Sequence, residues 1–169
     1  MFVRRLDFHA SWGMLLAFGL VQGDQPVLPG GRRLPSGDSP GDGPAFWRLD
    51  IHERNLSGLT LTGWLIGRCR VDATPFHDVD LRGAALVSSE FEDCDFLRAD
   101  LREVTLADSD FNGCGFTEAD LRGADLRGAT FIGGCSFRGA DLSGALALED
   151  QRDDLDLTEE QAASVRWSG

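Results

Sequence analysis

Residues 96–131 read FLRADLREVTLADSDFNGCGFTEADLRGADLRGATF, with a bulky apolar residue at every fifth position. The series extends beyond this stretch, and seventeen consecutive positions keep it: Ile51, Leu56, Leu61, Ile66, Val71, Phe76, Leu81, Leu86, Phe91, Phe96, Leu101, Leu106, Phe111, Phe116, Leu121, Leu126 and Phe131. After one inserted residue the spacing resumes at Phe137 and Leu142. A repeat this regular decides the fold before any other feature of the sequence.

A spacing of five fits neither a helix nor a flat strand. On a helix, five steps of about 100° turn each apolar side chain by roughly 140° from the one before it. On a flat strand, an odd step places successive apolar side chains on opposite faces. The backbone must therefore bend once in each repeat. Glycine accepts positive φ without steric cost, and it stands two residues after the bulky position at Gly58, Gly63, Gly83, Gly113, Gly123, Gly128, Gly133, Gly139 and Gly144.

A second period, of twenty residues, separates phenylalanines from leucines. The two aromatic columns are Val71, Phe91, Phe111, Phe131 and Phe76, Phe96, Phe116, Phe137, and the two aliphatic columns are Leu61, Leu81, Leu101, Leu121, Leu142 and Ile66, Leu86, Leu106, Leu126. Like residues would lie in ladders if four repeats made one coil, with about 4.8 Å between coils. The sequence therefore predicts an all-β fold, a four-sided parallel β-helix of about five coils.

Several repeats also share small and acidic residues at fixed positions. Residues 99–102 (ADLR) and 119–123 (ADLRG) resemble the A-D/N-L-x-x unit of the pentapeptide-repeat family, and the resemblance covers about 100 of the 169 residues. It implies a right-handed quadrilateral β-helix, the usual hand of parallel crossovers. In the early coils Trp64, Cys69 and Thr74 replace the small residue, so those coils are expected to be less regular.

Composition divides the chain into four parts. Residues 1–22 carry apolar side chains at alternate positions, which indicates a strand-rich cap for one end of the solenoid. Residues 23–45 are rich in proline and glycine and are expected to form a loop. Residues 46–147 form the repeats, and residues 148–169 form an acidic linker followed by a short helix.

The C-terminal helix has a recognisable start. Thr158 and Gln161 match a capping box, with acidic residues in the first turn, so a short helix is predicted through about Trp167. In the pentapeptide-repeat family, which this sequence resembles, the topoisomerase-binding members dimerise through their C-terminal ends. The helix is therefore expected either to cap a monomer or to form a dimer contact, with the apolar residues Leu155, Leu157, Val165 and Trp167 making that contact.

The charge and the cysteine content of the chain limit the classes of partner and of site that fit it. The chain has 28 acidic residues against 16 basic ones and a formal net charge of −12, which argues against nucleic acid or an anionic membrane surface as a direct partner. The four cysteines match no metal-binding spacing. Buried free thiols in the repeats would fit a reducing cytoplasm. No nucleophile stands beside a base, so the sequence predicts neither an enzyme nor a cofactor or metal site.

One face of the predicted solenoid is strongly acidic. Seven carboxylates stand beside the column of Phe91 and Phe111, with Arg70 as the opposing charge: Asp50, Glu53, Asp72, Glu90, Glu92, Asp93 and Asp110. Five coils span roughly 24 Å at about 4.8 Å each, and one DNA strand places about seven phosphates in that length. The face is therefore a candidate mimic of B-DNA, although a merely solvated acidic face would look the same.

The resemblance names a partner for such a face. The quinolone-resistance members of the family protect DNA gyrase and other topoisomerases from antibiotics, and this is the closest functional analogy. The main hypothesis is a bacterial protein-binding module that binds gyrase and confers antibiotic self-protection. The alternative is an interaction scaffold for another protein, such as a toxin, a transporter or an assembly factor.

Overall fold

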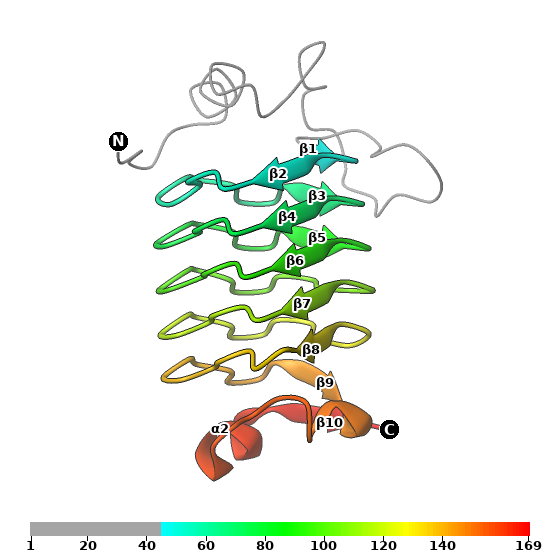
Figure 1. Ribbon diagram of the computed structural model, residues 1–169. Coiled ribbons are helices and arrows are strands. Elements are labelled where there is room, and N and C mark those ends of the chain that lie inside the picture. The colour runs from blue at the N-terminus through cyan, green and yellow to red at the C-terminus, as the bar shows by residue number, and fades with distance from the viewer. Residues whose placement is uncertain (1–44) are drawn as a thin grey trace.

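The computed structural model describes residues 45–169, which wind as a single solenoid with the strands stacked coil below coil (Figure 1). The strands are β1 (Ala45–Trp47), β2 (Asp50–His52), β3 (Leu65–Gly67), β4 (Arg70–Asp72), β5 (Ala85–Val87), β6 (Glu90–Glu92), β7 (Asp110–Asn112), β8 (Thr130–Ile132), β9 (Leu146–Leu148) and β10 (Arg166–Ser168). The helices are the 3₁₀ turn η1 (Glu149–Gln151) and α2 (Glu159–Ser164). The fold is a parallel β-solenoid of about six turns.

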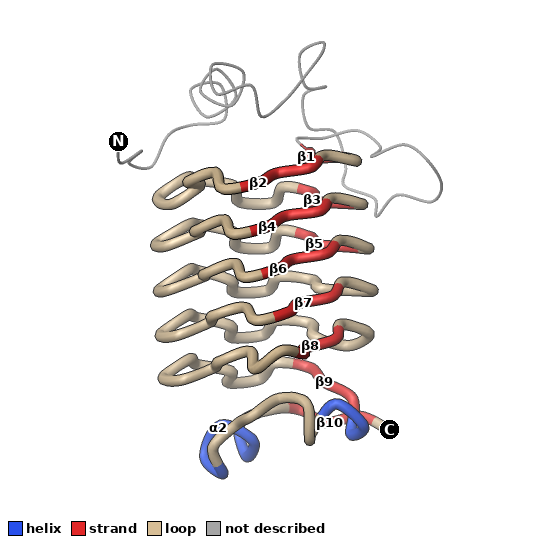
Figure 2. The backbone as a smooth tube through the Cα atoms, viewed as in Figure 1, coloured by secondary structure: helices blue, strands red, loops and turns tan. Residues whose placement is uncertain are grey.

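All strands pair in parallel, and through most of the solenoid the paired residues are twenty apart in the sequence. Sheet A contains β1, β3 and β5, and sheet B contains β2, β4, β6, β7 and β8. Phe46 pairs with Ile66, and Phe91 pairs with Phe111. Two further ladders of isolated bridges run through residues 75–95–115–136 and 60–80–100–120–141. These four ladders are the four sides, and loops connect them at each level (Figure 2).

The core is the stack of repeat side chains that the period of twenty predicts. The rings of Phe76, Phe96, Phe116 and Phe137 are nearly parallel, with centroids 4.7, 5.1 and 4.9 Å apart. Phe91, Phe111 and Phe131 form the second stack, with spacings of 4.8 and 5.3 Å. The two stacks meet edge to face, an arrangement that aromatic quadrupoles favour. The interior is therefore filled by the chain's own side chains.

The early coils keep the same register, contrary to the irregularity expected there. Strand β1 already pairs with β3 at an interval of twenty, and it begins at Ala45, one residue inside the predicted loop. Trp64 is 2% exposed and its ring centroid lies 5.0 Å from that of Phe46. The ring of Phe46 packs against this large side chain in the first coil. Cys69 and Thr74 are likewise buried.

Corners of the solenoid use the left-handed region, and not only at glycine. Glycines at the predicted bends have φ between 59° and 77°, but eleven other residues also have positive φ, including Ala73 at 46° and Ser88 at 49°. The inserted residue lies at such a corner, where Gly133 and Gly134 have φ of 65° and 79°. Beyond it the bridge interval becomes twenty-one, as between Asp120 and Asp141, while the core columns continue.

The acidic tail adds a turn that the sequence did not predict. Helix α2 has the predicted capping box of Thr158 and Gln161 but ends at Ser164 rather than near Trp167. Residues 166–168 instead form β10, which pairs in parallel with β9. The strand forms because its backbone can pair with β9, the last strand of the repeats, whose edge would otherwise be unpaired.

Two glutamines complete this end of the solenoid. The side-chain amide of Gln151 donates to the carbonyl oxygens of Leu126 and Ala129 at 2.9 and 2.7 Å. Gln161 donates in the same way to Phe137 and Ala140 at 2.7 and 3.0 Å. The carbonyls of Ala129 and Ala140 would accept from the backbone of a further coil, so at these two carbonyls the glutamine amides take the place of its N–H groups. The carbonyls of Leu126 and Phe137 also accept from the N–H groups of Ala129 and Ala140 within the same turn.

The predicted strand-rich cap of residues 1–22 and nearly all of the predicted loop of residues 23–45 lie outside the described residues. Within residues 45–169, neither helix has the length and apolar character of a membrane span.

Candidate functional surface

The acidic surface is the outward side of sheet B and the corner that follows it. The central residue of each strand is buried, as in Ile51, Val71 and Phe91, so its two neighbours point outward. The period of twenty aligns these neighbours in two rows, and the corner residues make a third. All seven predicted acidic residues lie in these rows: Asp50, Glu90 and Asp110 in the first, Asp72 and Glu92 in the second, and Glu53 and Asp93 at the corner.

Two of these carboxylates have a basic partner in the adjacent coil, which the sequence did not predict, and the partner of one of them is the positively charged Arg70. The guanidinium of Arg70 donates to the carboxylate of Glu90 at 2.8 Å, and the carboxylate of Glu90 raises the pKa of Arg70. The imidazole of His52 lies 2.6 Å from the carboxylate of Asp72. Both pairs join residues twenty apart, so the period itself was the signal that could have revealed them.

The other carboxylates of the surface point to solvent. Asp50, Glu92 and Asp93 are exposed and form no ion pair with any residue of the described solenoid. Asp110 accepts a hydrogen bond from the hydroxyl of Thr130. In the next coil the outward residues are Thr130 and Ile132, so the acidic surface ends there. Glu92 and Asp93 are therefore two adjacent exposed carboxylates without an ion pair in the described solenoid.

A different side carries balanced charge. The guanidinium groups of Arg82, Arg102 and Arg122 donate to the aspartate two residues before them, at 2.8, 2.7 and 2.6 Å. Each also approaches the aspartate of the next coil, at 3.6 to 3.8 Å. Hydrogen bonds from Arg122 lower the pKa of Asp120. Because opposite charges alternate here, this side presents no strong field of one sign.

Asp80, in this balanced ladder, is a buried charge. It is 2% exposed and accepts hydrogen bonds from the guanidinium of Arg82 and the hydroxyl of Thr62. Burial by itself raises the pKa of Asp80, but the hydrogen bonds from Arg82 and Thr62 outweigh it and hold the pKa below its ordinary value. The role of Asp80 is therefore structural.

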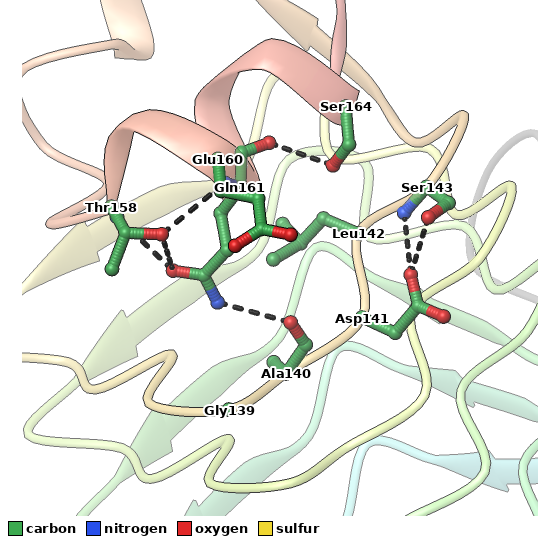
Figure 3. Close-up of a pocket in the computed structure, with 9 residues that line it drawn as sticks. All are labelled: Gly139, Ala140, Asp141, Leu142, Ser143, Thr158, Glu160, Gln161 and Ser164. Atoms are coloured by element: carbon green, nitrogen blue, oxygen red, sulfur yellow. Dashed lines mark hydrogen bonds between the residues drawn. The ribbon is translucent and has the colours of Figure 1, made fainter.

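Figure 3 shows a shallow pocket of about 470 Å³ between the last repeat coil and α2. Ser143 donates its hydroxyl to Asp141 at 2.6 Å, and Gln161 bonds to the backbone as described above. No histidine lines the pocket, so Ser143 has no base of the kind that activates a serine nucleophile. Across residues 45–169 no group of three or more His, Cys, Asp or Glu side chains could hold a metal ion.

Comparison with known proteins agrees with the geometry. The sequence profile described as "Pentapeptide repeats" matches eight copies, over residues 76–113, 94–133 and 116–146. The crystal structure of a pentapeptide repeat protein from the thylakoid lumen of Arabidopsis thaliana is 30% identical, with a TM-score of 0.55, and the match covers 65% of this chain and 72% of that one. The chain belongs to the pentapeptide-repeat family.

Two further solved structures of pentapeptide repeat and quinolone resistance proteins show lower similarity. HetL of the cyanobacterium Nostoc, a protein involved in the regulation of heterocyst differentiation, is 25% identical over 62% of this chain and 45% of its own, with a TM-score of 0.44. QnrB1, a plasmid-mediated fluoroquinolone resistance protein, is 15% identical over 72% of this chain and 73% of its own, with a TM-score of 0.33. Among curated protein sequences none matches this chain significantly.

The predicted C-terminal contact residues pack toward the pentapeptide-repeat core. Leu155 and Val165 are buried in it, at 1% and 7% exposure, and Leu157 and Trp167 are half-buried against it. The guanidinium of Arg152 lies 4.3 Å above the ring of Trp167, which favours a cation–π contact. These contacts place the four residues in a cap of the last coil. A dimer through this end stays a prediction.

The cysteines lie inside the solenoid as free, buried thiols. Cys94, Cys114 and Cys135 occupy one column in successive coils. Their thiols donate to backbone carbonyl oxygens, as from Cys114 to Phe91 at 3.4 Å. Burial raises the pKa of Cys69 to about 11, whereas a hydrogen bond with Cys114 lowers the pKa of Cys135 to about 7. Cys135 is only 6% exposed, so its thiol is shielded from solvent reagents.

Proposed function

We propose that this protein is a non-catalytic binding module whose acidic sheet-B surface occupies a basic, DNA-binding groove of a protein partner, with DNA gyrase or a related topoisomerase as the specific candidate. The observation that carries the proposal is the alignment of seven carboxylates in three rows on one side of a rigid solenoid. A groove that binds phosphates recognises negative charge at regular spacing.

The distribution of charge over the chain supports this role. Residues 1–44 contain four arginines and four aspartates, so the whole net charge of −12 belongs to residues 45–169. Within that part, the Arg82–Arg102–Arg122 side is balanced, and the excess negative charge lies on the sheet-B surface and in the acidic tail of residues 148–169. An asymmetric field of this kind speeds association with a basic partner and weakens with added salt.

Membership of the family supports a protein-binding role more broadly, because its members are generally structural or interaction proteins. An interaction scaffold for a different partner, such as a toxin, a transporter or an assembly factor, is the second candidate. The pairing of Arg70 with Glu90 and of His52 with Asp72 favours it, since these pairs interrupt the rows of negative charge. Buried free cysteines fit a cytoplasmic location for either function.

The test is a supercoiling assay with purified gyrase and the full-length protein, accompanied by a pull-down at two salt concentrations. We expect inhibition of supercoiling by the wild type and its loss in the double variant Glu92→Gln, Asp93→Asn. Both side chains are exposed and unpaired within the described solenoid, so the fold should be unaffected. Salt should weaken the capture of gyrase.

The matched control is the double variant Asp150→Asn, Asp153→Asn, which removes the same charge from the exposed acidic tail. If both double variants lose inhibition equally, net charge rather than the sheet-B surface drives binding. Wild-type protein that neither captures gyrase nor affects supercoiling would refute the gyrase proposal. Capture of a different partner that depends on Glu92 and Asp93 would then support the scaffold function.

A further inference from the structure

Three cysteines lie in one column of the interior, each in the coil next to the last. Cys94, Cys114 and Cys135 are buried free thiols. Backbone hydrogen bonds join their coils at the column itself: the N–H of Gly115 donates to the carbonyl of Cys94 at 2.9 Å, and the N–H of Ser136 donates to the carbonyl of Cys114 at 3.1 Å. The thiol of Cys114 interacts with the thiols of both neighbours. Cys114 therefore stands between two other thiols.

The spacing of the coils nearly suits a disulfide bond. A disulfide joins residues whose Cα atoms are about 4.4–6.8 Å apart and whose Cβ atoms are about 3.8 Å apart. Neighbouring coils lie about 4.8 Å apart, so the first condition is met. Cβ atoms directly above one another are about 1 Å too far apart for the second. One residue of the pair must therefore be able to shift toward the other.

Cys135 has more of this freedom than Cys94. The inserted residue of the solenoid stands just before Cys135, where residues 133–134 are glycines with positive φ. A Cβ added to Gly134 would meet no atom within 4 Å, so open space lies beside the backbone there. Glycine backbone can adjust into such space at little cost. Cys94 lies in the regular repeat, without an inserted residue. The pair that can close is therefore Cys114 with Cys135.

A cavity of about 420 Å³ gives a small molecule access to this pair. It is lined by Cys135 and the rest of residues 134–139 on the solenoid, and by residues 156–158 of the tail. The tail therefore provides the shield over the thiol of Cys135, which excludes bulky reagents. Hydrogen peroxide has only two oxygen atoms, about twice the size of a water molecule, whose share of liquid volume is about 30 Å³. A peroxide molecule fits this cavity.

We propose that Cys114 and Cys135 are a peroxide-sensitive pair, in which hydrogen peroxide converts the two thiols into a disulfide that joins adjacent coils. The thiolate of Cys135 attacks one peroxide oxygen, which breaks the O–O bond, releases hydroxide and leaves a sulfenic acid. The sulfur of Cys114 then attacks the sulfenic sulfur, and the S–S bond forms as water leaves. The two thiols lose two electrons and two protons, and the peroxide becomes two water molecules.

Cys135 is the residue of the pair that meets the peroxide. Its thiol borders the cavity, and the hydrogen bond with Cys114 lowers the pKa of Cys135 to about 7, so much of it is thiolate at neutral pH. Cys114 lies one coil farther from the tail, is 1% exposed and does not border the cavity. Its place suits a resolving thiol, which reacts after the first sulfur has been oxidised.

Peroxide treatment of the full-length protein followed by peptide mapping tests the proposal. The remaining thiols are alkylated in denaturant, and the peptides are identified by mass spectrometry. We expect a linked Cys114–Cys135 peptide that dithiothreitol separates, with Cys69 and Cys94 still free. The oxidised protein should also have a higher Tm, because the bond closes a loop that restricts the unfolded chain.

Serine variants identify the two sulfurs. Serine is buried at the equivalent inward position of a neighbouring column in Ser89 and Ser109, so the fold accepts it there. Cys135→Ser should lose both the linked peptide and the rise in Tm. The matched control Cys69→Ser should retain both, because the column neighbour of Cys69 is Ser89 and not a thiol. In Cys114→Ser the sulfenic acid at Cys135 has no partner thiol, and dimedone should label it.

Three results would overturn the proposal. These are free thiols at both Cys114 and Cys135 after peroxide treatment, a link between Cys94 and Cys114 instead, or sulfinic acid at Cys135 of the wild type without a linked peptide. An equal rise in the Tm of Cys135→Ser would also contradict it.

Discussion

At the scale of the residue, the corners of the solenoid show that the left-handed conformation is imposed by the coil and not by glycine. Ala73 and Ser88 adopt φ near 50° because the residues on either side are fixed in paired strands and a buried core. Such a conformation costs a non-glycine residue roughly 1–2 kcal/mol. The repeat tolerates this cost at eleven described corners, which indicates that strand pairing and core burial outweigh it.

This cost predicts a stabilising substitution. Ala73 is exposed and has φ of 46°, so Ala73→Gly should raise the free energy of unfolding by about 0.5–1 kcal/mol, the relief of strain exceeding the entropy that glycine adds to the unfolded chain. Urea denaturation measures the change. The control Ala107→Gly, at a residue without positive φ, should instead destabilise by about 0.5–1 kcal/mol. Equal effects of the two would contradict the explanation.

At the scale of the element, the glutamines that follow the last coil act as substitutes for the backbone of another turn. Gln151 stands in η1 and Gln161 in α2, and each donates to two carbonyls of the coil above. The sequence predicted the capping role of Gln161 within its own helix, but not its bonds to the solenoid. Those bonds depend on how the tail folds back, which no local pattern encodes.

The variant Gln151→Leu tests whether the side-chain amide stabilises the end of the solenoid by donating to backbone carbonyls. Gln151 is 7% exposed, so the change leaves the carbonyl of Ala129 without its donor and the carbonyl of Leu126 with the N–H of Ala129 alone, and it should cost about 1–3 kcal/mol of stability. Thermal unfolding monitored by circular dichroism would show the lower Tm. An exposed tail residue, Glu160→Leu, serves as the control and should change stability by less than about 0.5 kcal/mol. An unchanged Tm in Gln151→Leu would show that solvent satisfies the carbonyl of Ala129 in the variant.

The aromatic stacks make a second prediction about elements. Phe111 lies between Phe91 and Phe131 and meets Phe96 and Phe116 at its edges. Phe111→Ala should therefore cost about 3–5 kcal/mol, measured by chemical denaturation. Leu97→Ala, at a half-buried outward position of a neighbouring coil, should cost far less. A loss below about 1 kcal/mol at Phe111 would mean that the stack relaxes to fill the gap.

At the scale of the whole molecule, the sequence predicted the repeating part well and the ends poorly. Each core position was predictable because an inward-facing apolar side chain is required at every fifth residue and the same column is reached again after twenty. Phe96 and Phe116 are therefore expected to stack. Strand β10 has no repeat to identify it, and its three residues pair only because β9 offers an edge. Ion pairing on the acidic surface also escaped prediction, although Arg70 and Glu90 are twenty apart.

Acid sensitivity is a property of the molecule as a whole. Hydrogen bonds from Arg122, Arg127 and Arg98 lower the pKa values of Asp120, Asp125 and Asp78, respectively. Their contribution to stability is fully present above the unfolded-state pKa of about 3.9 and is lost as the pH falls through the lower folded-state values. We therefore expect the urea midpoint to fall steeply below about pH 4. In Arg122→Met this acid-dependent loss should be smaller, and an unchanged slope would contradict the assignment.

Because paired strands are twenty residues apart, the length of the solenoid can be changed by removing or adding whole coils of twenty residues. Excising residues 93–112 would join the end of β6 to the start of the next level, and Glu92 would be followed by Gly113 at the same kind of corner. The shortened rod should remain folded and lose about 4.8 Å of height. Duplicating residues 93–112 should lengthen the solenoid by the same height, so the length of the surface that this protein presents to a partner can be changed one coil at a time.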